Sequence, residues 1–439
     1  MSKTTLPAIL GGERARTTPY PPINFIGAEE KKLVAEVLES GILSGYVAHN
    51  GPYFGGGPMV HALEEELCRI FGVKHAVTVN SATSGLHAAV AASLAGLGDE
   101  VIVPPYTMSA TATTVAQTMA TPIFADIDPD NFCLDVADVR RKISKRTKAI
   151  VVANIFGGPA HLAELRALAD EHGLVLVEDA AQSPWATQQG KMTATIGHMG
   201  VLSFNCHKTI QCGEGGAVLT NDDTLADRLK LMRNHGEVVL SQRDDVPAEL
   251  AGMLGYNYRL TELQSAVALG QVRRLEELTV PRIEMANAIT AGLAGVPGIT
   301  PPHVAKGDRH VYYIYAMKVD AAKVGLSRNQ LKTALDAEGV AVAAGYVRPI
   351  YLYPMYEERV AKQKTGFGAG VWHPEPGRQT YARGLCPVTE RMHFEELLTT
   401  NIIRADLGRE DAMQLVTAIQ KVVEHAPAVR DALLAKGVS

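Results

Sequence analysis

The sequence predicts an α/β protein, with a larger part built on a mostly parallel, doubly wound sheet and a smaller C-terminal part of α+β type. Two observations predict this fold. From about residue 60 to 220, short runs rich in β-branched residues alternate with amphipathic helical segments, an order typical of a sheet covered by helices on both faces. Beyond Pro281 the pattern changes to a strand-like run at 312–319 followed by helical segments. We therefore predict two domains, residues 1–280, with the N-terminal segment included, and residues 281–439.

Each predicted element has its own signal. The buried strands are brief apolar runs of the length that strands have, at residues 75–79, 101–103, 122–125, 149–153, 174–177 and 217–220. The helices carry apolar residues in phase on one face, at residues 86–94, 110–119, 160–172, 260–278, 327–339 and 411–425. Glycines at 51, 55, 56 and 57 predict that residues 46–58 form a loop long enough to serve function.

Composition excludes several classes of protein. The 439 residues are 46% hydrophobic with a net charge of −5, and no dense basic tract offers a surface for nucleic acid. No apolar run reaches the roughly 18 residues of a membrane span, and the first residues lack an apolar signal segment. We therefore expect a cytoplasmic protein without a membrane partner. The five cysteines are widely scattered and are predicted to be free thiols.

Two polar segments follow predicted strands, at the edge where open α/β sheets bind ligands. Asp179 comes just after the strand at 174–177, and Gln182 lies three residues further on. Residues 80–85 link another strand to a helix, so the backbone N–H groups of Ala82 and Thr83 could bind a phosphate. Helix capping explains both segments as well, and the residues alone leave the two interpretations open.

The sequence around Lys208 indicates that this lysine is a reactive residue. It lies shortly before Gly-Glu-Gly-Gly at 213–216, which allows close backbone approach, and before the strand-like run at 217–220. Burial there would lower the pKa of its amine and let it form a Schiff base with an aldehyde. A carboxylate such as Asp179 would keep a pyridine nitrogen protonated, so the pair suggests pyridoxal 5'-phosphate (PLP) as the cofactor.

These segments resemble the DegT/DnrJ/StrS family of PLP-dependent aminotransferases, which act on keto-sugars and keto-cyclitols. The resemblance runs from about residue 20 to the C-terminus. It is carried by Val-Ile-Val-Pro at 101–104, Glu-Asp-Ala-Ala-Gln-Ser at 178–183, Ser-Phe-Asn at 203–205 with Lys208, Gly-Glu-Gly-Gly at 213–216 and Gly-Tyr-Asn-Tyr-Arg-Leu at 255–260. It implies the type I fold of PLP-dependent transferases and an obligate homodimer.

The resemblance also assigns roles. It implies that Lys208 makes the Schiff base and moves the proton, and that Asp179 pairs with the pyridine nitrogen. Further contacts to the cofactor would come from Gln182 and, at the phosphate, from Ala82, Thr83, Ser203 and an Asn257 that reaches over from the partner subunit. Met108 stands where the family usually has a stacking Trp or Phe, with Tyr106 two residues earlier, so the stacking residue is left open.

The implied activity is the ping-pong transfer of an amino group from L-glutamate or L-glutamine to a ketone, for amino sugars of polysaccharides or antibiotics. A nucleotide-linked keto-sugar is the first expected acceptor. A keto-cyclitol of the scyllo-inosose type, suggested by residues 346–349 and 393–398, is the second. Related sugar dehydratases carry His in place of the lysine, so Lys208 argues against that activity, whereas a regulatory member without turnover stays open. Cys206, His207 and Cys212 lack a metal-binding spacing, and no metal is expected.

Overall fold

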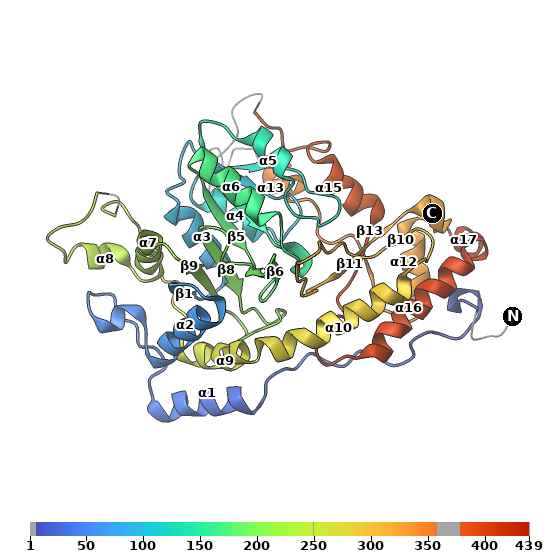
Figure 1. Cartoon of the computed structure of the whole chain (residues 1–439), viewed down its shortest axis with the longest axis horizontal. Coiled ribbons are helices and arrows are strands. Elements are labelled where there is room, and N and C mark those ends of the chain that lie inside the picture. Colours follow the sequence, from blue (N-terminus) through green and yellow to red (C-terminus); the bar gives the residue numbers. More distant parts are fainter. Residues whose placement is uncertain (1–5, 249, 358–377, 439) are drawn as a thin grey trace.

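The computed structural model describes residues 6–248, 250–357 and 378–438. Its larger part is a seven-stranded sheet with helices on both faces, and its smaller part carries a four-stranded antiparallel sheet. Figure 1 shows the two parts side by side, with the long helix α10 (Leu275–Leu293) leading from one to the other. The predicted α/β class with a mostly parallel sheet is confirmed.

The strands of the large sheet stand in the order β1-β9-β8-β5-β4-β2-β3. Neighbours from β8 to β3 run parallel, and β9 runs antiparallel to both β8 and β1. Their bounds are His75–Val79 (β1), Glu100–Val103 (β2), Thr121–Phe124 (β3), Thr147–Ala153 (β4), Val175–Asp179 (β5), Met199–Ser203 (β8) and Gly216–Thr220 (β9). A separate small hairpin joins β6 (Thr187–Gln188) and β7 (Lys191–Met192).

Every strand that the apolar runs predict in this sheet is present, with ends shifted by two residues or fewer, but β8 was not predicted. Glycines interrupt its apolar run. A Cβ atom on Gly200 would lie 2.2 Å from the backbone oxygen of Ala194, so the close approach of that segment requires a glycine in mid-strand.

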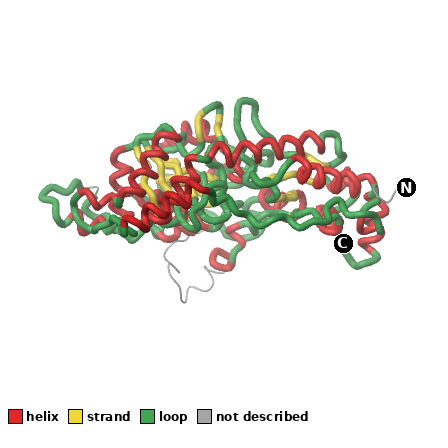
Figure 2. Tube along the Cα trace, turned by 90° about the horizontal axis from the view of Figure 1, so that it is seen from below, coloured by secondary structure: helices red, strands yellow, loops and turns green. Residues whose placement is uncertain are grey.

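Side chains of the large sheet alternate between its two faces. Val101 and Val103 of β2 pack in one core, whereas Ile102 between them packs in the opposite one. Helices α3 (Ala82–Ala92), α4 (Ala110–Gln117) and α7 (Asp223–Arg233) cover the first face. The other face is covered by α2 (Pro58–Phe71), α5 (Val136–Lys142), α6 (Leu162–His172) and α9 (Glu262–Arg273), with α1 (Ala28–Ser40) outside them. In Figure 2 the strands lie in two groups with helices alongside both. The sheet is therefore doubly wound, as predicted.

Helix α9 ends at Arg273, and α10 then runs through Pro281 to Leu293. The sequence predicted one helix over 260–278 that ends before Pro281, and this end is wrong. The carbonyl that loses its helical partner to the proline belongs to Glu277, an exposed residue in the first turn of α10, so the lost hydrogen bond lies on the solvent side of the helix. The predicted domain boundary at 280/281 falls inside α10 and stays a prediction.

The smaller part has the strand order β10-β11-β13-β12. Its strands are Ile299–Thr300 (β10), Tyr315–Val319 (β11), Ala343–Ala344 (β12) and Leu397–Thr400 (β13). Its helices are Ala321–Val324 (α11), Arg328–Ala337 (α12), Pro387–Arg391 (α15), Arg409–Glu424 (α16) and Ala426–Leu434 (α17). The predicted helices at 327–339 and 411–425 are thus present, whereas the predicted strand at 312–319 begins only at Tyr315.

Two segments of the chain pack on the other part of the molecule from the one that their place in the sequence suggests. The N–H groups of Ala8 and Ala15 donate to the Glu338 carboxylate at 2.7 and 2.9 Å, so the N-terminal segment packs on the smaller part although we predicted it with the larger. In the other direction, the segment with α13 (Pro354–Glu357) packs into the core of the large sheet. Both chain ends accordingly lie at the same end of Figure 1.

The glycine-rich residues 46–58 form a loop with one short 3-10 turn at Pro52–Gly55, and α2 begins at Pro58. A further short helix, α8 (Gly236–Leu240), lies beside it. Within the described ranges, the molecule contains no helix with the length and apolar character needed to cross a membrane.

Candidate active site

A cavity of about 360 Å³ opens at the carboxyl ends of β4, β5 and β8. This is the edge at which open α/β sheets bind ligands. Tyr313 and Tyr346 from the smaller part close its other side. The residues predicted from the sequence that line this cavity are Ala82, Thr83, Met108, Asp179, Gln182, Ser203 and Lys208.

Asp179 is the last residue of β5 and is 6% exposed. Its Oδ2 accepts a hydrogen bond from the Thr111 hydroxyl at 2.7 Å, and its Oδ1 accepts one from the N–H of Ala181 at 3.2 Å. Burial raises the pKa of Asp179, while Thr111 and Lys208 oppose that shift. A cationic group entering the cavity would stabilise the ionised carboxylate further.

Lys208 lies in the turn between β8 and β9, where its own N–H donates to the carbonyl of Asn205 at 2.9 Å. Its Nζ atom stands 4.6 Å from the centre of the Tyr313 ring. Burial lowers the pKa of the amine, and the negative charge of Asp179 opposes that shift. A lysine with a lowered pKa has more of its amine in the neutral form at neutral pH, and only the neutral amine can act as a nucleophile or accept a proton.

The N-terminus of α3 forms one end of the cavity. The Ser81 hydroxyl caps the helix by accepting from the N–H of Ser84 at 3.0 Å. Ala82 and Thr83, the first two residues of the helix, line the cavity together with Ser203. Capping does not compete with anion binding here, because the cap satisfies the third N–H and leaves the helix N-terminus facing the cavity.

Gln182 joins the two parts of the molecule. Its Oε1 accepts from the N–H of Phe156 at 2.8 Å, and its Nε2 donates to the Tyr346 hydroxyl at 3.0 Å. The edge of the Phe156 ring in turn meets Tyr346, with ring centres 5.2 Å apart. The side chain is thus held rigidly in the cavity wall.

Of the two candidates for the residue that stacks on the cofactor ring, one lies in the cavity and the other lies behind its wall. Met108 lines the cavity and is 58% exposed, so it is free to cover a ring that binds there. Tyr106 is buried, and its hydroxyl accepts from the N–H of Tyr346 at 2.8 Å and lies 3.3 Å from Nδ1 of His393. Tyr106 therefore supports the cavity wall from behind.

Asn257 does not line the cavity of its own chain. Its side chain is exposed, and its carbonyl accepts from Nδ2 of Asn80 at 3.3 Å. The predicted phosphate contact is therefore not made within one chain.

Three residues that the sequence did not indicate belong to this site, together with Tyr346, which lies in the segment 346–349 that suggested the cyclitol alternative. Thr111 holds Asp179, Asn154 lines the cavity at the end of β4, and Tyr313 and Tyr346 close the cavity from the smaller part. A hydroxyl in the first turn of α4 or an aromatic residue in a tyrosine-rich run carries no local signal for such a role.

The backbone beside Gln182 is strained and tightly packed. Phe156 has a φ of 59° and faces Tyr312, with a φ of 50°, across Gly157. A Cβ atom on Gly157, whose φ is +99°, would lie 2.7 Å from the backbone nitrogen of Tyr313. Gly157 is therefore needed for the two parts to meet at the cavity.

We expect Gly157→Ala to destabilise the protein by about 2–3 kcal/mol, because it adds steric overlap to an unfavourable left-handed conformation. Urea unfolding followed by circular dichroism measures the change. Gly173→Ala is the matched control, since Gly173 also has a positive φ of +63° but has no atom within 4 Å of the added Cβ. Equal losses for the two variants would contradict the tight packing at Gly157.

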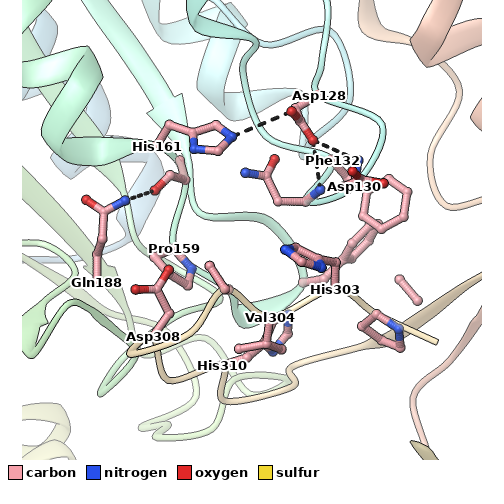
Figure 3. A pocket seen from close by; sticks show the side chains of 17 residues that line it. Asp128, Asp130, Phe132, Pro159, His161, Gln188, His303, Val304, Asp308 and His310 are labelled. Carbon is pink, nitrogen blue, oxygen red and sulfur yellow. Dashed lines mark hydrogen bonds and ion pairs between the residues drawn. The ribbon is translucent and has the colours of Figure 1, made fainter.

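A second cavity, of about 140 Å³, lies at the junction of the two parts. Figure 3 shows His161 and Asp128 facing each other at its rim, with His303 and His310 opposite. Asp128 raises the pKa of His161, while burial lowers that of His310 to about 3. Across the part of the chain that the structure describes, no three His, Cys, Asp or Glu side chains come together as metal ligands. We assign this cavity no role in the chemistry.

The residues of the cavity at the carboxyl ends of β4, β5 and β8 fit PLP. A buried carboxylate, a lysine with a lowered pKa and the N-terminus of an eleven-residue helix face one space, and they match a protonated pyridine, an aldehyde and a phosphate. Fold and cavity together define a class, the PLP-dependent aminotransferases. The chain belongs to the DegT/DnrJ/EryC1/StrS aminotransferase family, whose model matches residues 26–371.

Similar proteins agree with this assignment. The L-glutamine:2-deoxy-scyllo-inosose aminotransferase of Streptoalloteichus tenebrarius is 34% identical over 433 residues, which are 95% of this chain and 97% of that protein. The GDP-perosamine synthase of Vibrio cholerae is 33% identical over 342 residues, 78% of this chain and 88% of that one. The crystal structure of DesV from S. venezuelae in complex with a ketimine intermediate is similar with a TM-score of 0.74 at 32% identity, covering 90% of this chain and 95% of that one. The chain is thus an aminotransferase of a family that acts on sugars and related rings.

Proposed function

We propose that the protein uses PLP to move an amino group from L-glutamate or L-glutamine to the ketone of a sugar, in two half-reactions of ping-pong type. The observation that carries this proposal is the meeting of Lys208, Asp179 and the N-terminus of α3 in one cavity. The smaller cavity at the junction of the two parts is lined by none of these groups.

Each residue then has a defined task. PLP, when bound, stores the electron pair released as a proton leaves the substrate carbon. Lys208 accepts and returns that proton at Nζ, since its lowered pKa favours the neutral amine. Asp179 keeps the pyridine nitrogen protonated, and Ala82, Thr83 and Ser203 hold the phosphate. Gln182 fixes the wall beside the ring, and Met108 covers its face.

The acceptor is proposed to be a nucleotide-linked keto-sugar, as for the GDP-perosamine synthase relative by its name. A keto-cyclitol of the scyllo-inosose type is the second candidate. It is favoured by the cyclitol aminotransferase relative, whose similarity extends over 95% of this chain. The same cavity and the same residues would serve either ring.

The test begins with the purified protein loaded with PLP. Its absorption spectrum is recorded before and after an excess of L-glutamate or L-glutamine, and the cofactor band is expected to bleach with one of them. Scyllo-inosose or TDP-linked 4-keto-6-deoxyglucose is then added, and the amine product is detected by mass spectrometry. Bleaching followed by an aminated product supports the proposal. Absence of a cofactor band would overturn the cofactor assignment, and a band that neither donor bleaches would favour the dehydratase or the regulatory alternative.

A homodimer with shared active sites is proposed as well. Asn257 is exposed and lies outside the cavity of its own chain, as a residue would if it served a partner. Large apolar side chains are exposed on neighbouring segments, at Leu43, Tyr53, Val238 and Leu254. Apolar surface of this kind is usually covered by another protein. A cytoplasmic location remains a prediction from the sequence.

Mixing Lys208→Ala and Asn257→Ala chains should restore activity. Half of the dimers in an equal mixture contain one chain of each kind, and one of their two sites then has both residues intact. The mixture is therefore expected to reach about a quarter of the wild-type activity, well above either variant alone. Unfolding and refolding the mixture before the assay ensures exchange. Activity no higher than the mean of the two separate variants would contradict sharing through Asn257.

A further inference from the structure

The amine of Lys208 lies over an aromatic ring. Its Nζ atom stands 4.6 Å from the centre of the ring of Tyr313, a residue of the smaller part that also lines the cavity. A cation at this distance is attracted by the negative charge on the face of the ring. Among the described residues, no acceptor forms a hydrogen bond with this amine, and Asp179 acts on it through its charge alone. The ring face is therefore the group that the structure places against the amine.

The other charged groups of the cavity do not replace this contact. The carboxylate of Glu214 is exposed, so water weakens its field, and His207 is exposed as well. In the proposed function, the charge of Asp179 is matched by the protonated pyridine nitrogen. Among the described side chains, the Tyr313 ring is thus left as the group that attracts a protonated Lys208.

The backbone fixes the position of the Tyr313 ring. Nη2 of Arg282 donates to the carbonyl of Tyr313 at 3.3 Å and to that of the preceding residue at 3.0 Å. Arg282 is buried in α10, the helix that leads from one part to the other. The next N–H, that of Ile314, donates to the carbonyl of Phe156 at 3.2 Å. The smaller part thus presents the ring to Lys208 at a fixed place.

The effect of Tyr313 on the amine comes from the ring and not from a charged hydroxyl. Arg282, Cys206 and Tyr346 are the further titratable groups that act on the Tyr313 phenol or are affected by it. Burial raises the pKa of Tyr313 and raises that of Tyr346 to about 12. Both phenols are therefore neutral near pH 7.

A lysine that moves a proton has two opposite requirements. It has to be neutral before the transfer, and burial meets this requirement by lowering the pKa of Lys208. After the transfer it is an ammonium ion, which a buried site disfavours. A second carboxylate at this place would raise the pKa of Asp179 by repulsion between like charges. A ring face attracts the ammonium ion without that effect.

We propose that Tyr313 is a positioning residue whose ring face holds the Lys208 amine in the cavity and stabilises the ammonium ion that forms when Lys208 accepts the substrate proton. In this step the C–H bond of the substrate breaks, an N–H bond forms at Nζ, and the electron pair of the C–H bond passes toward the cofactor ring. The inference rests on the proposed function, because it explains how the residue that moves the proton is held.

The first test measures the amine in the protein without PLP. Labelling with trace amounts of acetic anhydride over a series of pH values, followed by mass spectrometry of the peptide that contains residue 208, gives the pKa of Lys208. Tyr313→Leu and Tyr313→Met are each expected to lower this pKa by about 0.5 to 1.5, because the ammonium ion loses the ring face. Tyr313→Phe keeps the ring and should stay within about 0.3 of the wild type.

The sign of the change separates the ring contact from a loosened cavity wall. A looser wall admits water, which favours the ammonium ion and raises the pKa. Tyr346→Leu is the matched control, since Tyr346 lines the same cavity while the amine stands over the ring of Tyr313. In this control the pKa of Lys208 should rise or stay unchanged. A pKa that does not fall in Tyr313→Leu, or that falls equally in Tyr346→Leu, would overturn the proposal.

The second test follows the donor half-reaction of the PLP-loaded protein. With L-glutamate or L-glutamine, whichever the wild type accepts, Tyr313→Leu should bleach the cofactor band about threefold to tenfold more slowly. Tyr313→Phe should stay within about twofold of the wild type, and an equal loss in both variants would contradict the role of the ring face. Absence of any donor reaction in the wild type would instead contradict the proposed function, while the labelling experiment would still decide whether the ring holds the amine.

Discussion

Replacing Lys208 by alanine is expected to lower turnover by about 10³-fold or more and to prevent covalent attachment of the cofactor. The amine is the only described lysine that lines the cavity, so neither its bond to the cofactor aldehyde nor its proton transfer has a substitute. The measurement is borohydride reduction of the PLP-loaded protein, followed by mass spectrometry of the peptide that contains residue 208. Wild type should carry the cofactor mass and the variant should not.

Two controls make this result specific. Lys191→Ala removes an exposed lysine of β7 that lies outside the cavity, and it should behave like the wild type. Adding a small primary amine such as ethylamine to Lys208→Ala should restore part of the turnover, since the missing group is a base of known position. A variant that still bound the cofactor covalently would show that another amine does the chemistry.

The position of Asp179 could be predicted because a local rule decides it. A buried strand ends in the sequence just before the acid, and parallel strands place such ends at the ligand edge of the sheet. Lys208 was found in a different way, from the glycines that follow it and from a resemblance that spans several segments. In both cases the information lies in sequence motifs and not in contacts between distant segments.

Tyr313 could not be predicted in this way. The run at 312–319 has the composition of a strand, but residues 311–314 bond instead to the turn at 156–157, with Val311 N–H donating to Gly157 and Ile314 N–H to Phe156. The left-handed Tyr312 then delays the strand until Tyr315. A contact between segments more than 150 residues apart overrides the local propensity here.

The same reason applies to Thr111 and to the place of Tyr346 in the cavity wall, although residues 346–349 had already suggested the cyclitol acceptor. Thr111 of α4 is joined to Asp179, the last residue of β5, by a hydrogen bond, and Tyr346 reaches the cavity because its segment packs back onto the large sheet. Neither arrangement leaves a periodic signal. The proposed catalytic residues were thus accessible from the sequence, whereas the positions of the residues that hold them and line the cavity required the three-dimensional structure.

Asp179→Asn is expected to keep the fold and the cofactor but to lower turnover about a hundredfold to a thousandfold. The amide can keep the hydrogen bond from Ala181, and the Thr111 hydroxyl can rotate to accept from the new NH₂ group. The negative charge that holds the pyridine nitrogen protonated is then the one feature lost. Absorption spectra and kcat of the loaded variant measure the effect, and Thr111→Val, which keeps the charge, should lose much less. Full activity of Asp179→Asn would refute the role of the carboxylate.

The thermal stability of the protein without PLP provides an independent test of the charge on Asp179. Because burial raises the pKa of Asp179 in the folded state, the folded protein binds more protons at this site than the unfolded chain between the unfolded pKa of about 3.9 and the raised folded value. The stability that the protonated acid contributes is therefore present below the unfolded pKa and is lost as pH rises through the folded pKa. Without PLP, Asp179→Asn should match or exceed the thermal stability of the wild type at pH 7, and the difference should shrink at pH 4. With PLP bound, the wild type should be more thermally stable than Asp179→Asn. The ionised carboxylate then faces the protonated pyridine nitrogen, and this attraction offsets the cost of burying its charge.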